Sequence, residues 1–190
     1  RDGGPADVRL RVEVVEAMGF ETYAHGRVAG APFVARLDGG PTVARFRFPR
    51  DVTVDGSGNI FVADTGNFRV RKIALDGTVW TVSTLAGSGQ YGNADGPPTT
   101  ATFGLLSGIT ALADGRVVVS DAVFHRLRQV APDGTVSPLA GTGVAGFADG
   151  PAGGAQVAFP TGLSRDATGH LYLADTGNNV ICADRDASKI

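Results

Sequence analysis

The sequence has a single cysteine, Cys182, so the chain forms no disulfide within itself and cysteine usage leaves the redox compartment open. Its longest apolar runs are only a few residues long, whereas a helix needs roughly 20 apolar residues to cross a bilayer. We therefore expect no membrane-spanning helix. Neither sign of charge is in excess, because the net charge is −2 and the pI is near 5.9. This balance gives no general attraction to nucleic acid.

Glycine and proline are abundant instead, with 28 and 10 copies, which indicates many turns and few long helices. With 43% hydrophobic and 19% charged residues, the composition is typical of a soluble globular protein. Fifteen arginines against two lysines suit a GC-rich bacterial genome. The sequence begins at Arg1 rather than at methionine, so the localisation stays open, and a secreted or cell-envelope protein with its leader removed is one interpretation.

An internal repeat organises most of the chain. The segment "VADTGNFRVRKI" at 62–73 returns as "LADTGNNVICAD" at 173–184, and a weaker copy, "VVSDAVFHRLRQV", lies between them. Asp121 thus lies 57 positions after Asp64 and 54 before Asp175. The linkers "LAGSGQYGNADGP" and "LAGTGVAGFADGP" follow the same register. A period of about 55 residues predicts a repeat architecture.

Each repeat consists of short β-rich runs separated by turn residues, such as "VTV", "NIFVAD", "RVRKI" and "TVSTLAG" in the first copy. Asp and Asn can hydrogen-bond their own backbone in a turn, and Gly accepts positive φ, so these residue types mark the connections. One repeat is therefore expected to form a four-stranded antiparallel meander, and stacking such units around an axis gives a β-propeller. The structural turn residues predicted at the strand ends are Asp64, Asn67, Asp121, Asp175 and Asn178.

The same residues resemble a known family. The pattern P-x-x-V-x-V-D-x-x-G-N-I-F-V-A-D-T-G-N-x-R-V-R-K-I, followed by D-G-x-V, is similar to the NHL repeat. The resemblance implies an all-β, partial (open) propeller with about two full blades, at about 44–100 and 101–154, and a partial blade at 155–190. The middle copy departs from the pattern where Ala122-Val123-Phe124 replaces Thr-Gly-Asn, and the last copy lacks the basic strand and the Asp-Gly turn.

Two interpretations apply to the β-rich N-terminal segment 1–40, which precedes the propeller segment 41–190. In the first, it supplies the closing strands of an earlier partial blade, because Val28-Ala29-Gly30 lies 57 positions before Leu85-Ala86-Gly87. In the second, residues 12–37 resemble the TOBE domain of the ATPase subunit of sugar ABC importers. That resemblance implies regulatory or ligand contacts, and no Walker motif accompanies it.

Other motifs resemble nucleotide-binding, calcium-binding or catalytic sites, but turns and loops of the repeat explain them better. Residues 87–92 and 141–146 both satisfy G-x-G-x-x-G, yet each is followed by Ala-Asp-Gly-Pro, which argues against the helix that a dinucleotide site requires. Asp55-x-Ser57-x-Asn59 resembles the start of a calcium loop but lacks its later glutamate. The three histidines occupy non-equivalent positions in the repeats. We therefore expect no catalytic residue, no metal site and no cofactor.

The recurrent basic feature is a pair of arginines in the third strand of each full repeat. Strand alternation places Arg69 and Arg71 on one side and Val70 on the other. Some NHL propellers bind RNA through a basic face, but two arginines on the solvated side of a strand are more often solvated or paired with neighbouring acids. The weak surface-interaction candidates are Arg69, Arg71, Arg126 and Arg128. Nucleic acid is not the partner we expect.

Together these observations favour a non-catalytic binding or scaffolding module for a protein or a small ligand. One alternative is a fragment of a propeller enzyme of the lyase or lactonase type, and another is a TOBE-like N-terminus from a sugar importer. A closed six-bladed ring at this period needs about 330 residues. We therefore expect either a fragment of a longer protein or a homodimer joined through open propeller edges.

Overall fold

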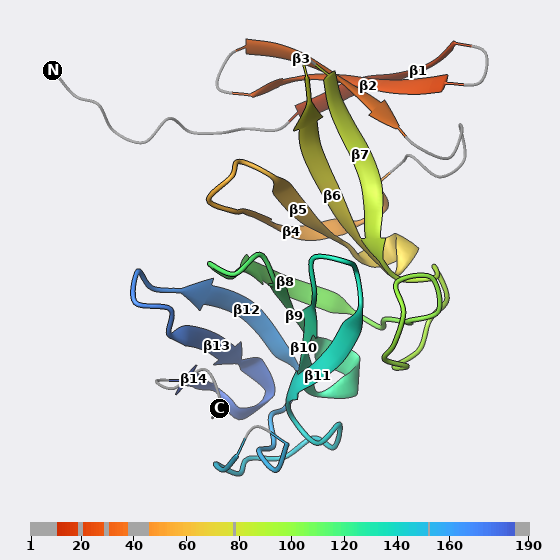
Figure 1. Cartoon of the computed structure of the whole chain (residues 1–190). Helices are drawn as coiled ribbons and strands as arrows, with labels where there is room; N and C mark the ends of the chain where they lie inside the picture. Colours follow the sequence, from red (N-terminus) through yellow and green to blue (C-terminus); the bar gives the residue numbers. More distant parts are fainter. Residues whose placement is uncertain are drawn as a thin grey trace, which may run out of the picture. The chain divides into compact units, whose positions relative to one another are not determined.

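The computed structural model describes residues 11–18, 21–28, 31–37, 46–77, 79–151 and 153–184. These residues form fourteen β-strands and three short 3₁₀ turns, without an α-helix (Figure 1). Nothing in this part of the chain is a helix of the length and apolarity that a membrane span needs. The chain divides into two compact units, one of residues 1–45 with 73–83 and the other of residues 46–72 with 84–190.

The N-terminal strands form an antiparallel meander of β1 (Arg11–Met18), β2 (Glu21–Val28) and β3 (Ala31–Leu37). β3 pairs in parallel with β7 (Val79–Ala86). In the described residues these strands belong to an open sheet of order β1-β2-β3-β7-β6-β5-β4 rather than to a closed barrel. The two interpretations of the N-terminal segment, an earlier blade and a TOBE-like segment, stay predictions.

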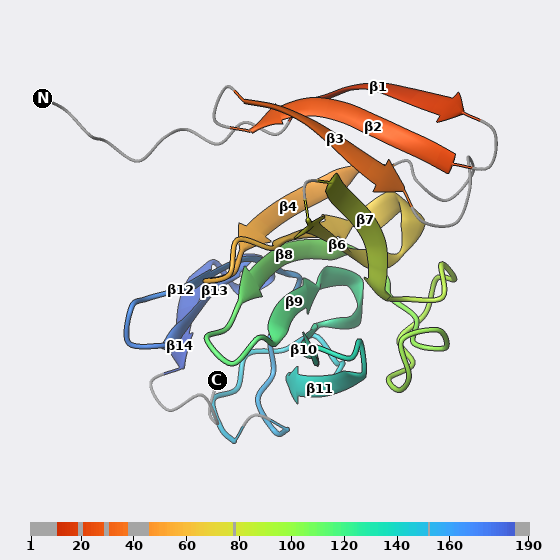
Figure 2. The same ribbon diagram turned by 45° about the horizontal axis from the view of Figure 1, so that its top comes forward.

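The other strands repeat one pattern three times. The first copy consists of β4 (Pro49–Val54), β5 (Ile60–Asp64), β6 (Arg69–Asp76) and β7. The second is a four-stranded sheet of β8 (Leu106–Ala111), β9 (Val117–Asp121), β10 (Arg126–Val130) and β11 (Val136–Ala140). The third is a three-stranded sheet of β12 (Pro160–Arg165), β13 (Leu171–Asp175) and β14 (Val180–Asp184). Figures 1 and 2 both show the second and third sheets side by side.

Apolar side chains on both faces of the second sheet explain why it stacks between its neighbours. Val117 and Val119 of β9 pack into one cluster with first-repeat residues such as Phe61. Val118 points to the opposite face, as strand alternation requires, and packs with Leu173 of the third repeat. Every residue of β9 is buried. Runs that are apolar at successive positions are typical of strands covered on both faces.

The first strands of successive copies approach closely. The backbone N–H of Ile109 in β8 donates to the Asp51 carboxylate of β4 at 2.9 Å. On the other side of β8, a Cβ added to Gly108 would overlap the carbonyl oxygen of Thr161 and the nitrogen of Leu163, both in β12. Only glycine leaves room for this approach. The copies are thus stacked as blades, and in the residues that the structure describes the third copy is a three-stranded sheet.

Candidate interaction surface

An aspartate at the end of the second strand of each copy anchors the segment that enters the first strand. Its carboxylate accepts a backbone N–H from the residue 17 positions earlier in all three copies. The pairs are Arg47 N to Asp64 at 2.7 Å, Gly104 N to Asp121 at 2.9 Å and Ala158 N to Asp175 at 2.7 Å. All three aspartates are completely buried.

The 3₁₀ turns η1 (Thr65–Asn67), η2 (Ala122–Phe124) and η3 (Thr176–Asn178) follow these aspartates. Asn67 Nδ2 donates to the other oxygen of Asp64 at 2.9 Å, and Asn178 Nδ2 donates to Asp175 at 2.7 Å. The middle copy has Phe124 at this position, so it lacks that side-chain bond. The five residues predicted as turn residues therefore all lie at the ends of second strands or in these turns, where they bond to the backbone or to each other.

Burial controls the ionisation of two of the three carboxyl groups. It raises the pKa of Asp64 and of Asp121 above the usual 3.8. Backbone N–H donors and the neighbouring arginine, Arg71 or Arg128, oppose this shift without cancelling it. The carboxyl groups are thus held mainly by fixed hydrogen-bond donors in a dry environment.

The prediction that all four arginines lie on a solvated face is wrong for Arg71 and Arg128, which are 1% and 0% exposed. The long loop before the second repeat folds over Arg128 and supplies the acceptors that its guanidinium needs. Arg128 donates to Asp95 at 2.7 and 2.9 Å and to the carbonyl oxygens of Ala94 and Thr102. Its guanidinium also lies 4.7 Å from the ring centroid of Phe103. Pairing with a neighbouring acid occurs as expected, but inside the protein.

Arg69 and Arg126 precede these buried arginines and are half-buried. Arg69 Nε and NH2 donate to the carbonyl oxygens of Gly87 and Ser88, at 3.4 and 3.2 Å. These bonds tie the beginning of the loop after β7 to the start of β6. As interaction residues the two arginines stay a prediction, and the pair Arg71 and Arg128 is too deeply buried to contact a phosphate.

The third repeat lacks the buried cation, because Cys182 stands where the others have Arg71 and Arg128. Burial and then the charges of Asp175 and Asp149 raise the pKa of the Cys182 thiol. Asp149 is the repeat equivalent of Asp95 and is exposed, whereas Asp95 is half-buried against its arginine. The last copy therefore has both acids of the cluster without the base between them.

Aromatic rings gather on the surface above these anchors, which we call the turn face. It comprises the three 3₁₀ turns, the starts of β4, β8 and β12, and the loops 87–105 and 141–159. The ring of Tyr91 lies 5.7 Å from that of Phe68 and 5.4 Å from that of Phe124, so it bridges the first two repeats. The ring of Phe159 lies 4.6 Å from that of His125, and its backbone N–H donates to His125 Nδ1, which joins the next two.

Several of these rings are open to solvent. Phe48 is 74% exposed, Phe147 66%, Tyr91 61% and Phe159 51%. Phe48 and Phe159 precede Pro49 and Pro160 and have φ of 45° and 47°, a left-handed conformation that is unfavourable for a bulky residue. The fold thus holds two phenylalanines in a strained backbone with their rings in water.

Sequence reasoning missed this surface. The available signal was the Phe-Pro pair that directly precedes the first strand of the first and third copies. Phe68 and Phe124 each contact the ring of Tyr91. Which loop aromatics stay exposed depends on how the glycine-rich loops fold, and composition does not report that.

The motifs set aside as structural lie in turns and loops. The two G-x-G-x-x-G segments lie in loops without a helix behind them. The Asp55 carboxylate accepts the backbone N–H groups of Ser57 and Asn59 and the Asn59 side chain, as in a hairpin turn. Across the described ranges, no three His, Cys, Asp or Glu side chains come close enough to hold a metal ion.

Comparison with known families agrees with this geometry. Residues 46–73 match the family model described as NHL repeat. The chain contains an NHL repeat. The predicted NHL-type propeller fold is therefore confirmed, including its open, unclosed form in the described residues.

The chain is 33% identical, over 130 residues, to the Protein SUPPRESSOR OF QUENCHING 1, chloroplastic, of Arabidopsis thaliana. The alignment covers 64% of the chain but 12% of that protein. Two solved structures from Bacteroides thetaiotaomicron share the fold. An auxiliary nutrient binding protein has a TM-score of 0.66 at 16% identity, covering 87% of this chain and 43% of its own. A protein of unknown function has a TM-score of 0.61 at 20% identity, covering 89% and 55%. At these identities the likeness concerns the fold alone.

Proposed function

We propose that this chain is a non-catalytic binding module that holds a segment of a partner protein on its turn face. The observation that carries the proposal is the set of exposed aromatic rings on the turn face. Beneath them, the buried aspartates hold the strand entries and the 3₁₀ turns in place through hydrogen bonds. Aromatic residues are enriched among interface residues that contribute most to affinity, because they bury much area at little entropic cost. The strained backbone at Phe48 and Phe159 supports a functional role for their exposure.

The distribution of the rings favours an extended protein segment over a small molecule. Tyr91 lies between the first and second repeats and Phe159 between the second and third. A small-molecule site is usually a concave pocket with a few convergent polar groups. Rings set along successive repeats suit a peptide whose apolar side chains contact one repeat after another. The arginine-based alternative is weaker, because two of the four guanidiniums are buried.

A phage-displayed library of random dodecapeptides tests this proposal. The selected peptides are synthesised, and their affinities for the wild-type chain, Tyr91→Ala, Phe159→Ala and Leu75→Ala are measured by calorimetry. Leu75 is a matched control, because it is 55% exposed at the far end of β6. We expect each turn-face variant to weaken binding about tenfold or more, as loss of a central aromatic contact does, and Leu75→Ala to bind as the wild type.

Thermal unfolding of each variant establishes that it is folded before its affinity is compared. Selected peptides that bind all four proteins equally would place the preferred binding surface elsewhere and overturn the proposal. Failure to enrich any peptide on the wild-type chain would count against it as well.

A further inference from the structure

His125 holds the backbone of Phe159 through a contact between the second and third repeats. It follows η2 in a left-handed conformation, with φ of 50°, and its Nδ1 accepts the backbone N–H of Phe159 at 3.1 Å. The two rings meet in a T-shaped contact, with their planes at 88° and their centroids 4.6 Å apart. Phe159 has a strained backbone, with φ of 47°, and such a conformation persists only where neighbouring groups fix it.

The hydrogen bond exists in only one protonation state of His125. Because Nδ1 accepts the N–H, it carries no proton, and the neutral ring is the tautomer with its hydrogen on Nε2. A protonated imidazole has donors at both nitrogens and no acceptor, so turning the ring over does not restore the bond. Histidine is the side chain whose charge ordinarily changes between about pH 8 and pH 5. Acid therefore removes the acceptor of the Phe159 N–H and places two donors face to face.

Few charged groups surround this contact. Arg126 follows His125, and Asp149 is the one ionisable residue of the loop that precedes β12, while η3 and the start of β12 add none. Asp121 precedes η2 and Asp175 bonds to the residue before Phe159, and both are completely buried. Burial raises the pKa of Asp121, so its carboxyl group is the competing source of a pH response. Replacing the imidazole distinguishes the two groups.

The other repeats show which side chains the position of His125 accepts. Phe68 in the first repeat and Asn179 in the third occupy the equivalent left-handed position, with φ of 53° and 58°. Asparagine has a side-chain oxygen that accepts an N–H and does not titrate, whereas phenylalanine has a ring without an acceptor. Both residues are thus compatible with the backbone, and only histidine makes the contact depend on pH.

We propose that His125 is a positioning residue of the turn face, which holds Phe159 in its binding conformation while the imidazole is neutral and releases it when the ring gains a proton. Binding of the partner segment therefore weakens in acid. The inference rests on the proposed function, because Phe159 is one of the rings that contact the partner. His125 acts through Phe159.

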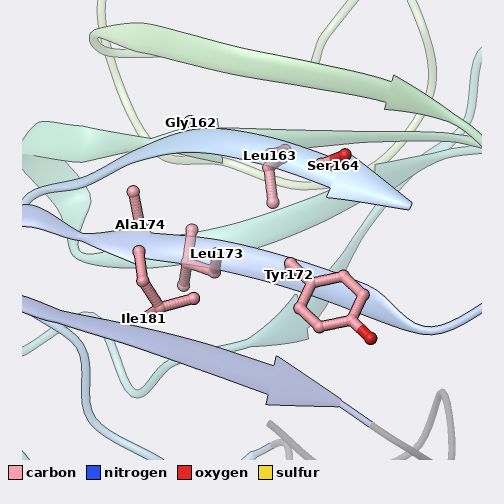
Figure 3. Close-up of a pocket in the computed structure, with 7 residues that line it drawn as sticks. All are labelled: Gly162, Leu163, Ser164, Tyr172, Leu173, Ala174 and Ile181. Carbon is pink, nitrogen blue, oxygen red and sulfur yellow. The ribbon is translucent and has the colours of Figure 1, made fainter. Parts of the chain in front are cut away.

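A second histidine lies beside another apolar surface and provides the control. Figure 3 shows a shallow hollow of ≈ 260 Å³ on the third sheet, with Tyr172 and Ile181 among the residues that line it. The Tyr172 hydroxyl donates to Asp166 at 3.2 Å, and Asp166 lies 3.0 Å from His170 Nδ1. A peptide bound in this hollow would respond to His170. His170→Asn removes that response and introduces the residue type of Asn59, its counterpart in the first repeat.

Nuclear magnetic resonance of the free 190-residue chain tests the contact without a partner. The imidazole nitrogens and the Phe159 amide are followed from about pH 8 to about pH 5. We expect the Nε2–H tautomer of His125 at the higher pH, and a Phe159 amide resonance that shifts with the same midpoint as the His125 ring. A proton on Nδ1 at the higher pH, or an amide resonance that does not follow the ring, would overturn the proposal whether or not a peptide binds.

Peptide binding then tests the effect on the turn face. Dodecapeptides selected on the wild-type chain are chosen without His, Asp or Glu and with blocked ends, and calorimetry gives their affinities at about pH 7.5 and about pH 5. We expect the wild type and His170→Asn to bind about three- to tenfold more weakly at the lower pH, as loss of one hydrogen bond predicts. His125→Asn should bind at both pH values as tightly as the wild type does at the higher one. His125→Phe should bind at both as weakly as the wild type does in acid.

Thermal unfolding at both pH values establishes that each variant is folded. A His125→Asn variant that keeps the pH dependence of the wild type would overturn the proposal and point to Asp121 instead. Loss of the dependence in His170→Asn would also overturn it, because the peptide would then lie in the hollow. If no peptide is enriched, the proposed function fails together with the binding part of this inference, while the Phe159 amide resonance still decides whether His125 positions Phe159.

Discussion

Asp121 shows how one buried carboxylate can organise a repeat. It ends β9, accepts the backbone N–H of Gly104 at 2.9 Å and lies 3.7 Å from the guanidinium of Arg128. The same donor geometry recurs at Asp64 and Asp175, so the aspartate sets the position of the strand entry in every copy. The cost is burial of a carboxyl group, and that cost appears as a raised pKa.

The raised pKa of Asp121 predicts how stability depends on pH. Below 3.8 the carboxyl group is protonated in both states, and as pH rises the unfolded chain loses its proton first. The contribution of Asp121 to the free energy of unfolding therefore falls between pH 3.8 and the folded-state pKa. The difference in free energy of unfolding between wild type and Asp121→Asn, measured in urea, should shrink as pH rises from about 4 toward neutral. A difference that grows over this range would mean that Arg128 holds the pKa below 3.8.

Cys182 gives a prediction about the incomplete cluster of the third repeat. Cys182→Arg places a cation between Asp175 and Asp149, as Arg128 lies between Asp121 and Asp95. Because this site is only half-buried, we expect a gain of up to about 1 kcal/mol in the free energy of unfolding. Cys182→Leu is the control for size without charge and should not show the gain. Equal changes in the two variants would refute a role for the charge.

At the scale of the element, the blades are joined mainly through their first strands. The Ile109 backbone N–H of β8 donates to the Asp51 carboxylate of β4 on one side, and Gly108 of β8 approaches the backbone of β12 on the other. Ser120 Oγ adds a bond to the Thr161 carbonyl oxygen at 2.5 Å. Each blade is a meander that cannot cover both of its apolar faces alone, so these interfaces stabilise the whole stack.

Gly108→Ala is expected to reduce the free energy of unfolding by about 1–3 kcal/mol, because the added methyl group overlaps the backbone of β12. Gly56→Ala changes the same residue type in an open hairpin and should be neutral within about 0.5 kcal/mol. Urea unfolding of the two variants and the wild type gives the comparison. If both variants unfold like the wild type, close packing of β8 on β12 does not limit stability.

At the scale of the whole molecule, the repeats of residues 46–72 and 84–184 form NHL-type blades that are held together by packing and hydrogen bonds. Their side chains do not form a group of three metal ligands in any part that the structure describes. The recurrent carboxylates of Asp64, Asp121 and Asp175 accept hydrogen bonds from backbone N–H groups, and arginines lie beside the first two. Because the recurrent aspartates already accept hydrogen bonds from the protein, we predict that the stability of the repeats does not depend on metal ions.

We expect EDTA to leave the midpoint of thermal unfolding unchanged, since a metal bound to the folded state would raise it. Elemental analysis of the purified protein should accordingly find zinc and calcium well below one equivalent. Stoichiometric metal, or a clear decrease of the midpoint in EDTA, would instead favour the propeller-enzyme alternative.

The amino-acid sequence by itself determined the repeat, its register and the strand and turn pattern of each blade. These features are local, because alternation, Asp and Asn in turns and glycine at positive φ act within a few residues. The aspartates at the strand ends were recognisable for the same reason.

Only the tertiary structure decided which arginines are buried and which aromatic rings are exposed. The strand pattern shows that Arg69 and Arg71 lie on one face of the strand and Val70 on the other. It does not show whether a distant loop covers the face with the arginines. The loop before the second repeat buries Arg128 against Asp95, 33 positions away, while the same loop leaves Tyr91 in solvent. Such burial depends on contacts between segments far apart in sequence, which only the folded chain brings together.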